Sequence, residues 1–477
     1  MTKHAAILCL VAVAAPAAAD DHAPSSLQMR APPPAGDEGA PPAEDNGKTE
    51  VISVTDTPIE RTLVTGRAPV SVVTRADLDA SGRATLGDIL QALPAQANAG
   101  NAQVNAGGDG TTRINLRGLG APRTLVLVNG RRMVNGGSGA DASVDVNTIP
   151  LAMVERVEIL KDGASALYGA DAVGGVVNII TRPQFDGLDV SLLTSTSQHG
   201  DGTEYDASFV TGFTTKDKNT YLVVSGGYQH HEPVLAGDRA FSQFQDSYDF
   251  ASRTVTRNQS LAAIGGRLDP SSIGPGGMAP PGCASDACKP DGNGGWTRFS
   301  SGDLYNEATQ SYVYTPSTRY NVFGTAGNRL GDHAALLLEV SYLHRSSDRQ
   351  LSPVAFTADS PISKDSLYNP LGGDLLDYRR RMTELGAREF IDTVSTTRIV
   401  LGVTGSVPAS WGVLDGWKYE LSYNYGTSDA LAGTTGQLNK LRLTDALGPS
   451  MLDAGGAPIC VRVPGDATTK IVYHVFL

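Results

Sequence analysis

The sequence predicts a small α+β domain followed by a wall of antiparallel membrane β-strands, and three observations lead to this fold class. The 477 residues contain 30 aromatic side chains, of which 28 follow residue 186. That aromatic-rich part contains segments of about ten residues in which apolar and polar side chains alternate, as in outer-membrane barrels. No run of 18 apolar residues follows the N-terminus, which argues against a helical membrane protein.

The residues of the N-terminal domain predict its elements in order. Thr74 and Thr85 each precede an acidic residue by three positions, Asp77 and Asp88, as at the start of a capped helix. After Thr85, leucine and isoleucine residues recur at the spacing of one helical face, which predicts a helix that ends before Pro94. Short apolar or alternating runs predict strands at residues 70–74, 113–117, 124–129, 156–161 and 173–181, and a helical turn is expected at 165–168.

Seven alternating segments predict the wall. In residues 336–342 and 417–425, apolar side chains face one way and polar side chains the other. A soluble β-sandwich or a β-solenoid would show a similar alternation. Long Gly- and Pro-rich stretches, 265–303 and 352–385, are expected to be loops on one side of the wall. The other predicted strands are 188–197, 205–213, 221–228, 319–326 and 399–403.

The N-terminus predicts export. Residues 1–19 read as a signal peptide with a short apolar core and Ala17-Ala18-Ala19 before the cleavage point, and residues 20–48 as a disordered Pro-rich linker. Export permits disulfides, so Cys283 and Cys288 are expected to pair across their loop rather than to begin a metal site. Cys460 is left without a partner.

Charge and motifs exclude several functions. The net charge is −12 and no Lys/Arg cluster occurs, which argues against a nucleic-acid partner. Residues 136–140 lack the spacing of a nucleophile elbow, and no glycine-rich stretch fits a phosphate loop. His230 and His231 are adjacent, so on a strand they point to opposite faces. We therefore expect no enzyme, no catalytic residue, no metal and no cofactor.

Four ordered motifs in the N-terminal domain resemble the plug domain of TonB-dependent outer-membrane receptors. They are INLRG at 114–118, VLVNGRR at 126–132, IPLAMVERVEI at 149–159 and YGADAVGGVVNIIT at 168–181. The resemblance implies an α+β plug domain at residues 66–186, followed at 187–477 by antiparallel transmembrane β-barrel strands of the 22-stranded type.

The resemblance also implies a segment that couples the receptor to TonB and its inner-membrane motor complex. Such a segment is extended and adds as a strand to a partner sheet. Within the region 50–65 two candidates fit, and the first is preferred because it directly follows the flexible linker. The second candidate is 60–65. The residues of the first are Glu50, Val51, Ile52, Ser53, Val54 and Thr55.

Roles for individual plug residues follow from the same resemblance. Arg117 is expected to pair with a wall carboxylate and so fasten the plug. The loops 98–109 and 132–141 are expected to reach the outer side, where loops carry binding residues. The candidate ligand-binding residues there are Gln103, Asn105, Arg132 and Asn135.

The implied function is energy-coupled uptake of a scarce extracellular ligand across the outer membrane of a Gram-negative bacterium. A siderophore, cobalamin, an oligosaccharide or a peptide would each suit, and outer-membrane lipid is a further partner. The alternative is a binding receptor or adhesin without transport. Residues 187–477 are expected to supply ten to twelve strands, too few to close the barrel, so a truncated or frame-shifted copy is predicted.

Overall fold

The computed structural model describes residues 70–471, except 107, 138–142, 284–285, 358–360, 409, 411 and 413–416. Both candidate coupling segments, 50–55 and 60–65, lie outside the described residues. None of the helices within this range has the length and apolar character needed to cross a bilayer.

A five-stranded mixed sheet with the order β1-β4-β5-β2-β3 forms the N-terminal domain. β2 and β5 pair in parallel, and the other pairs are antiparallel. Short helices join the strands. The strands are β1 (Val70–Thr74), β2 (Thr124–Val128), β3 (Arg131–Arg132), β4 (Val154–Leu160) and β5 (Gly175–Thr181). The helices are α1 (Arg75–Ala80), α2 (Leu86–Gln91), α3 (Ser165–Tyr168), η1 (Ala121–Arg123), η2 (Val146–Thr148), η3 (Leu151–Met153) and η4 (Ala170–Ala172).

The caps that the sequence predicts are present, but one predicted strand is not. The hydroxyls of Thr74 and Thr85 accept hydrogen bonds from the backbone amides of Asp77 and Asp88 at the starts of α1 and α2. Residues 113–117 form only one isolated bridge, between Gln96 and Leu116. The strand cannot continue because Arg117 adopts a positive φ of 58°, which turns the chain.

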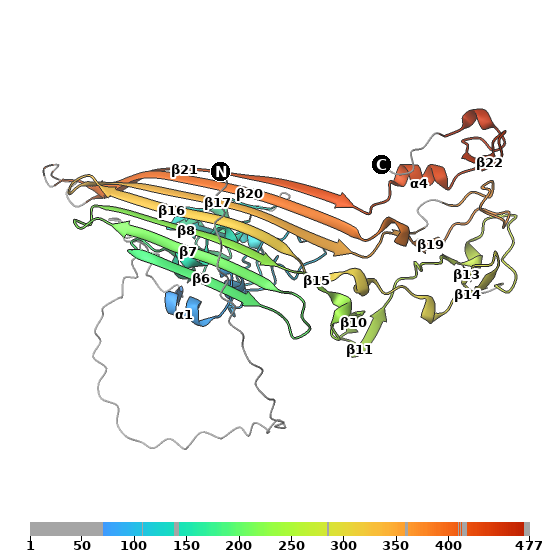
Figure 1. The fold of residues 1–477 in the computed structure, drawn as a ribbon, viewed down its shortest axis with the longest axis horizontal. Helices are drawn as coiled ribbons and strands as arrows, with labels where there is room; N and C mark the ends of the chain where they lie inside the picture. The colour runs from blue at the N-terminus through green and yellow to red at the C-terminus, as the bar shows by residue number, and fades with distance from the viewer. Residues whose placement is uncertain are drawn as a thin grey trace, which may run out of the picture. The chain divides into compact units, whose positions relative to one another are not determined.

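Seven long strands form one antiparallel sheet, here called the wall sheet, with the order β21-β20-β17-β16-β8-β7-β6 (Figure 1). Each of the seven predicted segments falls mostly or wholly within one of these strands. The predicted number of ten to twelve is wrong for the described residues, because the remaining strands are short and lie within loops. The bounds are β6 (Gly187–Ser195), β7 (Glu204–Thr214), β8 (Thr220–His231), β16 (Ser317–Arg329), β17 (Ala334–Leu351), β20 (Arg388–Ser406) and β21 (Lys418–Thr435).

One face of the wall sheet exposes apolar side chains and the other buries charged ones, as a wall in a membrane requires. On β17, Leu338 is 40% exposed, whereas its neighbour Glu339 is 1% exposed. On β20, Leu401 is likewise exposed and Arg398 is buried. Apolar side chains therefore cover the outer face, and the charged side chains point toward the N-terminal domain.

The two longest connections between strands lie at the same end of the wall sheet. The strand registers place the connections 215–219, 330–333 and 407–417 at one end. Connections 196–203, 232–316 and 352–387, together with 436–471, lie at the other end. This asymmetry is typical of outer-membrane barrels.

The long connections contain short elements of their own. The strands are β9 (Val234–Leu235), β10 (Gln245–Asp249), β11 (Thr254–Asn258), β12 (Arg267–Leu268), β13 (Cys288–Pro290), β14 (Trp296–Arg298), β15 (Tyr312–Tyr314), β18 (Ala355–Phe356), β19 (Tyr378–Arg381), β22 (Ser450–Leu452) and β23 (Pro458–Cys460). The helices are η5 (Ala236–Asp238), η6 (Pro270–Ser272), η7 (Ser301–Asp303), η8 (Glu307–Gln310), η9 (Thr383–Leu385), α4 (Lys440–Ala446) and η11 (Ala467–Thr469).

The N-terminal domain packs directly against the wall sheet. Its apolar core is continuous with Val210, Val223 and Phe323, which point inward from β7, β8 and β16. The N-terminal domain also comes very close to β21. A Cβ atom at Gly426 would lie 2.0 Å from Cγ2 of Val134, so a side chain there has no room.

We predict that Gly426→Ala lowers the free energy of unfolding by about 1–3 kcal/mol, because the new methyl group overlaps Val134. Urea unfolding in detergent or lipid measures this change. Gly433→Ala, on the same strand with its nearest atom 4.0 Å away, is the control. Adding Val134→Ala should recover part of the loss, and equal effects at Gly426 and Gly433 would contradict the close approach.

Candidate functional site

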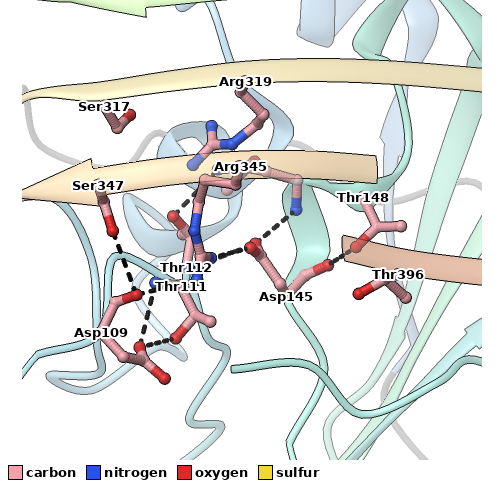
Figure 2. A network of polar contacts seen from close by, with 12 residues as sticks. Asp109, Thr111, Thr112, Asp145, Thr148, Ser317, Arg319, Arg345, Ser347 and Thr396 are labelled. Atoms are coloured by element: carbon pink, nitrogen blue, oxygen red, sulfur yellow. Dashed lines mark hydrogen bonds and ion pairs between the residues drawn. The ribbon is translucent and has the colours of Figure 1, made fainter. Parts of the chain in front are cut away.

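The buried polar contacts between the N-terminal domain and the wall sheet form two clusters. The first, here called the Arg345 cluster, comprises Asp109, Asp145, Arg345 and Ser347. Arg345 on β17 is fully buried, and its Nη1 lies 2.5 Å from Oδ2 of Asp145. Its Nη2 donates to the carbonyl oxygen of Asp109 at 2.9 Å, and the Ser347 hydroxyl lies 3.4 Å from the same oxygen. Figure 2 shows Arg345 reaching between the two aspartates.

The Asp109 carboxylate has its own partners in the N-terminal domain. Thr111 donates its hydroxyl and its backbone amide to Oδ1, and Arg113 lies 2.7 Å from Oδ2. Burial by itself raises the pKa of Asp109, but the hydrogen bonds from Thr111 and the charges of Arg113 and Arg345 outweigh it. The pKa of Asp109 therefore lies below its ordinary value, and the group is charged at neutral pH.

The second cluster, here called the Arg131 cluster, comprises Asn129, Arg131, Glu339, Arg398 and Glu420. Arg131 on β3 lies 3.1 Å from Glu339 on β17 and 3.1 Å from Glu420 on β21. Arg398 on β20 lies 3.0 Å from the other oxygen of Glu339. Asn129 donates to Glu339 at 2.8 Å. One wall carboxylate thus binds two buried arginines from different parts of the fold.

A cavity of about 390 Å³ separates part of the N-terminal domain from the wall sheet. It lies between α1, α2 and η3 on one side and β6, β7, β8 and β16 on the other. Its lining combines charged and amide side chains, among them Arg75, Asp79, Asp206, Gln229 and Arg319, with apolar side chains from η3 and the facing strands. The interface is therefore closed by ion pairs at β17, β20 and β21 and is partly open and polar on the opposite side.

The described residues of three long connections, 232–316, 352–387 and 436–471, fold together into what we call the outer cap. Arg381 is buried at its centre and donates to the carbonyl of Pro353 at 2.7 Å and to Ser260 at 2.7 Å. It also pairs with Glu307. The backbone amide of Ser363 donates to the carbonyl oxygen of Leu447, which links connection 352–387 to connection 436–471. Arg381 therefore binds residues of two connections, and backbone bonds add the third.

The outer cap also contains Cys283, Cys288 and Cys460. Cys283 and Cys288, expected to pair across their loop, are joined by a disulfide. Cys460 is a free, half-buried thiol in β23. Burial raises its pKa, and the charge of Asp445 adds to this effect, so the thiol is protonated at neutral pH.

Arg117 does not make the contact expected of it. Its guanidinium donates to the carbonyl oxygens of Val173 and Gly174, inside its own domain. The positive φ at Arg117 turns the chain at this point, and the side chain lies along the segment that leads into β5. No wall carboxylate contacts it among the residues that the structure describes. Arg131 and Asp145 make the ion pairs to the wall instead.

The four candidate ligand-binding residues lie in different surroundings. The Asn105 side chain is buried and bonds the backbone of Gln350 at the end of β17, with its Nδ2 2.6 Å from the Gln350 carbonyl. Arg132 is exposed and binds Asp171 and the carbonyl of Tyr168. Gln103 and Asn135 have exposed side chains. Asn105 thus fastens its loop to the wall, and the ligand roles of all four residues stay predictions.

Sequence reasoning missed most of the residues in the two clusters. The alternation in 336–342 and 417–425 predicts that Glu339 and Glu420 lie on the polar face of their strands, but that pattern does not identify a partner. The available signal was a charged residue at an inward position of an alternating strand, which needs a counter-charge when buried. Arg345 and Arg398 occupy such inward positions and are buried.

Comparison with known proteins identifies the N-terminal domain. The family model of the TonB-dependent Receptor Plug Domain matches residues 63–176. Residues 63–176 therefore form a plug domain of the kind found in TonB-dependent receptors. In this chain the plug domain is followed by the long antiparallel strands of the wall sheet. The chain is similar to the vitamin B12 transporter BtuB of Photobacterium profundum, with 38% identity over 143 residues. That match covers 30% of this chain and 22% of the transporter.

Solved structures of receptors are also similar in part. The ferric enterobactin receptor PfeA of Pseudomonas aeruginosa, as its G324V mutant, aligns with a TM-score of 0.42 and 16% identity, over 76% of this chain and 49% of that one. The siderophore receptor PirA of Acinetobacter baumannii aligns with a TM-score of 0.38 and 16% identity, over 76% and 44%. The chain thus spans about half of these receptors and about a fifth of the transporter.

We predict that Glu339→Gln lowers the free energy of unfolding by about 3–5 kcal/mol, because two buried arginines lose the charge that they share. Asp189→Asn is a suitable control, since the Asp189 carboxylate is 62% exposed in its pair with Arg182 and should contribute less than about 1 kcal/mol. Urea unfolding compares the two variants. A Glu339→Gln loss as small as that of the control would show that the Arg131 cluster does not hold the plug.

Asp109 should add an acid-dependent part to the stability of the plug. Because its pKa is lower in the folded chain than the ordinary 3.8, this contribution is complete above that value and is lost as the pH falls through the lowered pKa. Unfolding measured from about pH 2 to pH 6 should therefore lose less stability with acid in Asp109→Asn than in the parent. An identical acid dependence in the two proteins would refute this role.

Proposed function

We propose that this chain serves energy-coupled uptake of a scarce extracellular ligand, with the plug domain as a gate that the barrel wall holds closed. The observation that carries the proposal is the pair of buried ion clusters that fasten a recognised plug domain to the inner face of the wall sheet. A plug that only filled the lumen could be held by apolar packing, which is often at least as stabilising as buried ion pairs.

The composition of the interface suits a gate that moves. Buried ion pairs break when water enters and re-form in one geometry, because each charge has a fixed partner. The polar cavity beside β6, β7 and β8 already offers a surface that water can wet. Energy for the movement would come from TonB and its inner-membrane motor complex, through the coupling segment 50–55 or the alternative 60–65.

The outer cap and the exposed plug residues Gln103 and Asn135 are the proposed surfaces of ligand capture. The end of the wall sheet opposite the outer cap would face the periplasm and the outer cap the exterior of a Gram-negative outer membrane, with lipid against the apolar face. Cobalamin is the first ligand to try, since a relative is named a vitamin B12 transporter. Siderophores, oligosaccharides and peptides are the next ligands to test.

We predict that Ile52→Pro abolishes uptake and leaves binding unchanged, because proline removes a backbone donor that strand addition to TonB requires. Labelled cyanocobalamin and a panel of ferric siderophores are the probes. Binding is measured on outer-membrane vesicles and uptake on cells expressing the full chain. Ile52→Val keeps the extended, β-branched character and is the control.

Other outcomes separate the alternatives. Loss of uptake in Leu63→Pro but not in Ile52→Pro would move the coupling segment to 60–65. Binding of a probe without uptake by the parent protein would favour a receptor or adhesin that does not transport.

A further inference from the structure

Arg345 links two parts of the plug that are separated in the chain. Arg345 contacts both plug segments at once. One is the turn at Asp145 that begins η2, here called the Asp145 turn, and the other is the apical loop, here defined as the described residues of 98–110. A guanidinium can serve both because its nitrogens point in fixed, different directions, whereas the ammonium of lysine is a single point charge. The side chain is fully buried, so both contacts are made without competing water.

The apical loop is fastened to the outer end of the wall sheet. The side chain of Asn105 bonds the backbone of Gln350, and the amide of Thr315 donates to the carbonyl of Ala102 at 2.9 Å. Gly110 lies against Ser347, where a Cβ atom would be 2.2 Å from the hydroxyl oxygen. Any displacement of this loop therefore changes the position of the Asp109 carbonyl relative to Arg345.

The Asp145 turn leads inward to helix α2. Oδ1 of Asp145 accepts from the amides of Thr112 and Asn147, at 3.2 and 3.1 Å. Asn147 in turn accepts from the amide of Gly87 in α2 at 2.8 Å and donates to the Thr112 hydroxyl at 3.0 Å. Gly87 has no free space, since a Cβ atom there would lie 2.3 Å from Thr112. The first turn of α2 is thus held by the same buried network.

Helix α2 is close in the chain to the entrance of the plug. It follows α1 and β1, and β1 begins at Val70, downstream of both candidate coupling segments. We propose that Arg345 is a positioning residue that makes the apical loop and α2 respond as one unit, so that occupancy at the outer loop is felt at the coupling side. This inference rests on the proposed uptake function, but its test needs neither ligand nor TonB.

The chain offers a matched control. Arg398 is also a buried wall arginine that binds one carboxylate, Glu339, and one plug carbonyl, that of Arg132 at 3.2 Å. Its plug contact is to the last residue of β3, and it contacts neither the apical loop nor α2. Substitution by lysine keeps the charge and burial of each arginine but removes its hydrogen bond to a plug carbonyl. Comparing the two variants therefore tests which plug segment the arginine holds.

Hydrogen exchange of the full chain in detergent tests the proposal. Arg345→Lys should lower protection by about tenfold both in the apical loop, where the Val104 amide bonds Asn101, and at Gly87 in α2. Arg398→Lys should leave protection at Gly87 unchanged and lower it around β3. Loosening confined to the apical loop in Arg345→Lys would overturn the proposal, as would equal loosening of α2 in both variants.

A second variant keeps the proposal testable if Arg345→Lys does not fold. Asn147→Ser removes the acceptor for Gly87 and leaves Arg345 in place. Because coupling between two sites is reciprocal, protection should then fall in the apical loop as well as in α2. An effect limited to α2 would refute the coupling. Uptake loss in Ile52→Pro is an independent readout, so failure of this inference is distinguishable from failure of the uptake proposal.

Discussion

The structure depends on the pairing of charges that the wall sheet directs inward. Side chains alternate along a strand, so a wall whose outer face meets hydrocarbon must place its charged residues on the inner face. Glu339, Arg345 and Arg398 are there and are almost fully buried by the plug. An unpaired charge in that position would cost several kcal/mol. The plug brings counter-charges to Arg345 and Glu339, whereas Arg398 pairs with Glu339 within the wall.

The two clusters supply these counter-charges with opposite polarity. In the Arg345 cluster the wall contributes the cation and the plug the anion. In the Arg131 cluster the plug contributes Arg131 and the wall contributes Glu339 and Glu420. A plug turned to another orientation would bring like charges together, which costs free energy and excludes the alternative docking. The charges thus specify one orientation more than they add stability.

The remaining contacts between plug and wall combine tight packing with an open region, which suits an interface that can change its arrangement. Val210, Val223 and Phe323 extend the plug core into the wall, and close approaches at Gly110 and Gly426 fix the distance. The polar cavity interrupts this packing beside β6, β7 and β8. Buried networks with discrete partners switch between arrangements rather than deforming gradually, which is the property that a gated plug requires.

The sequence by itself determined the fold class, the seven wall strands and the helix caps of the plug. These features follow from local chemistry: period-two alternation, threonine caps and ordered motifs can all be read from neighbouring residues. It also placed Glu339 and Glu420 on the polar face of their strands. It overestimated the number of strands and expected a strand at 113–117, because short loop strands and a positive φ leave little trace in composition.

Only the tertiary structure decided which charges meet. Arg345 lies 200 residues from Asp145 in the chain, and Arg131 lies 208 residues from Glu339. No local pattern encodes such pairs, since their proximity depends on the register of the wall strands and on the orientation of the plug inside them. The expectation that Arg117 faces the wall comes from the family resemblance, which does not single out Arg131. Burial and partner geometry, which exist only after folding, distinguish the two.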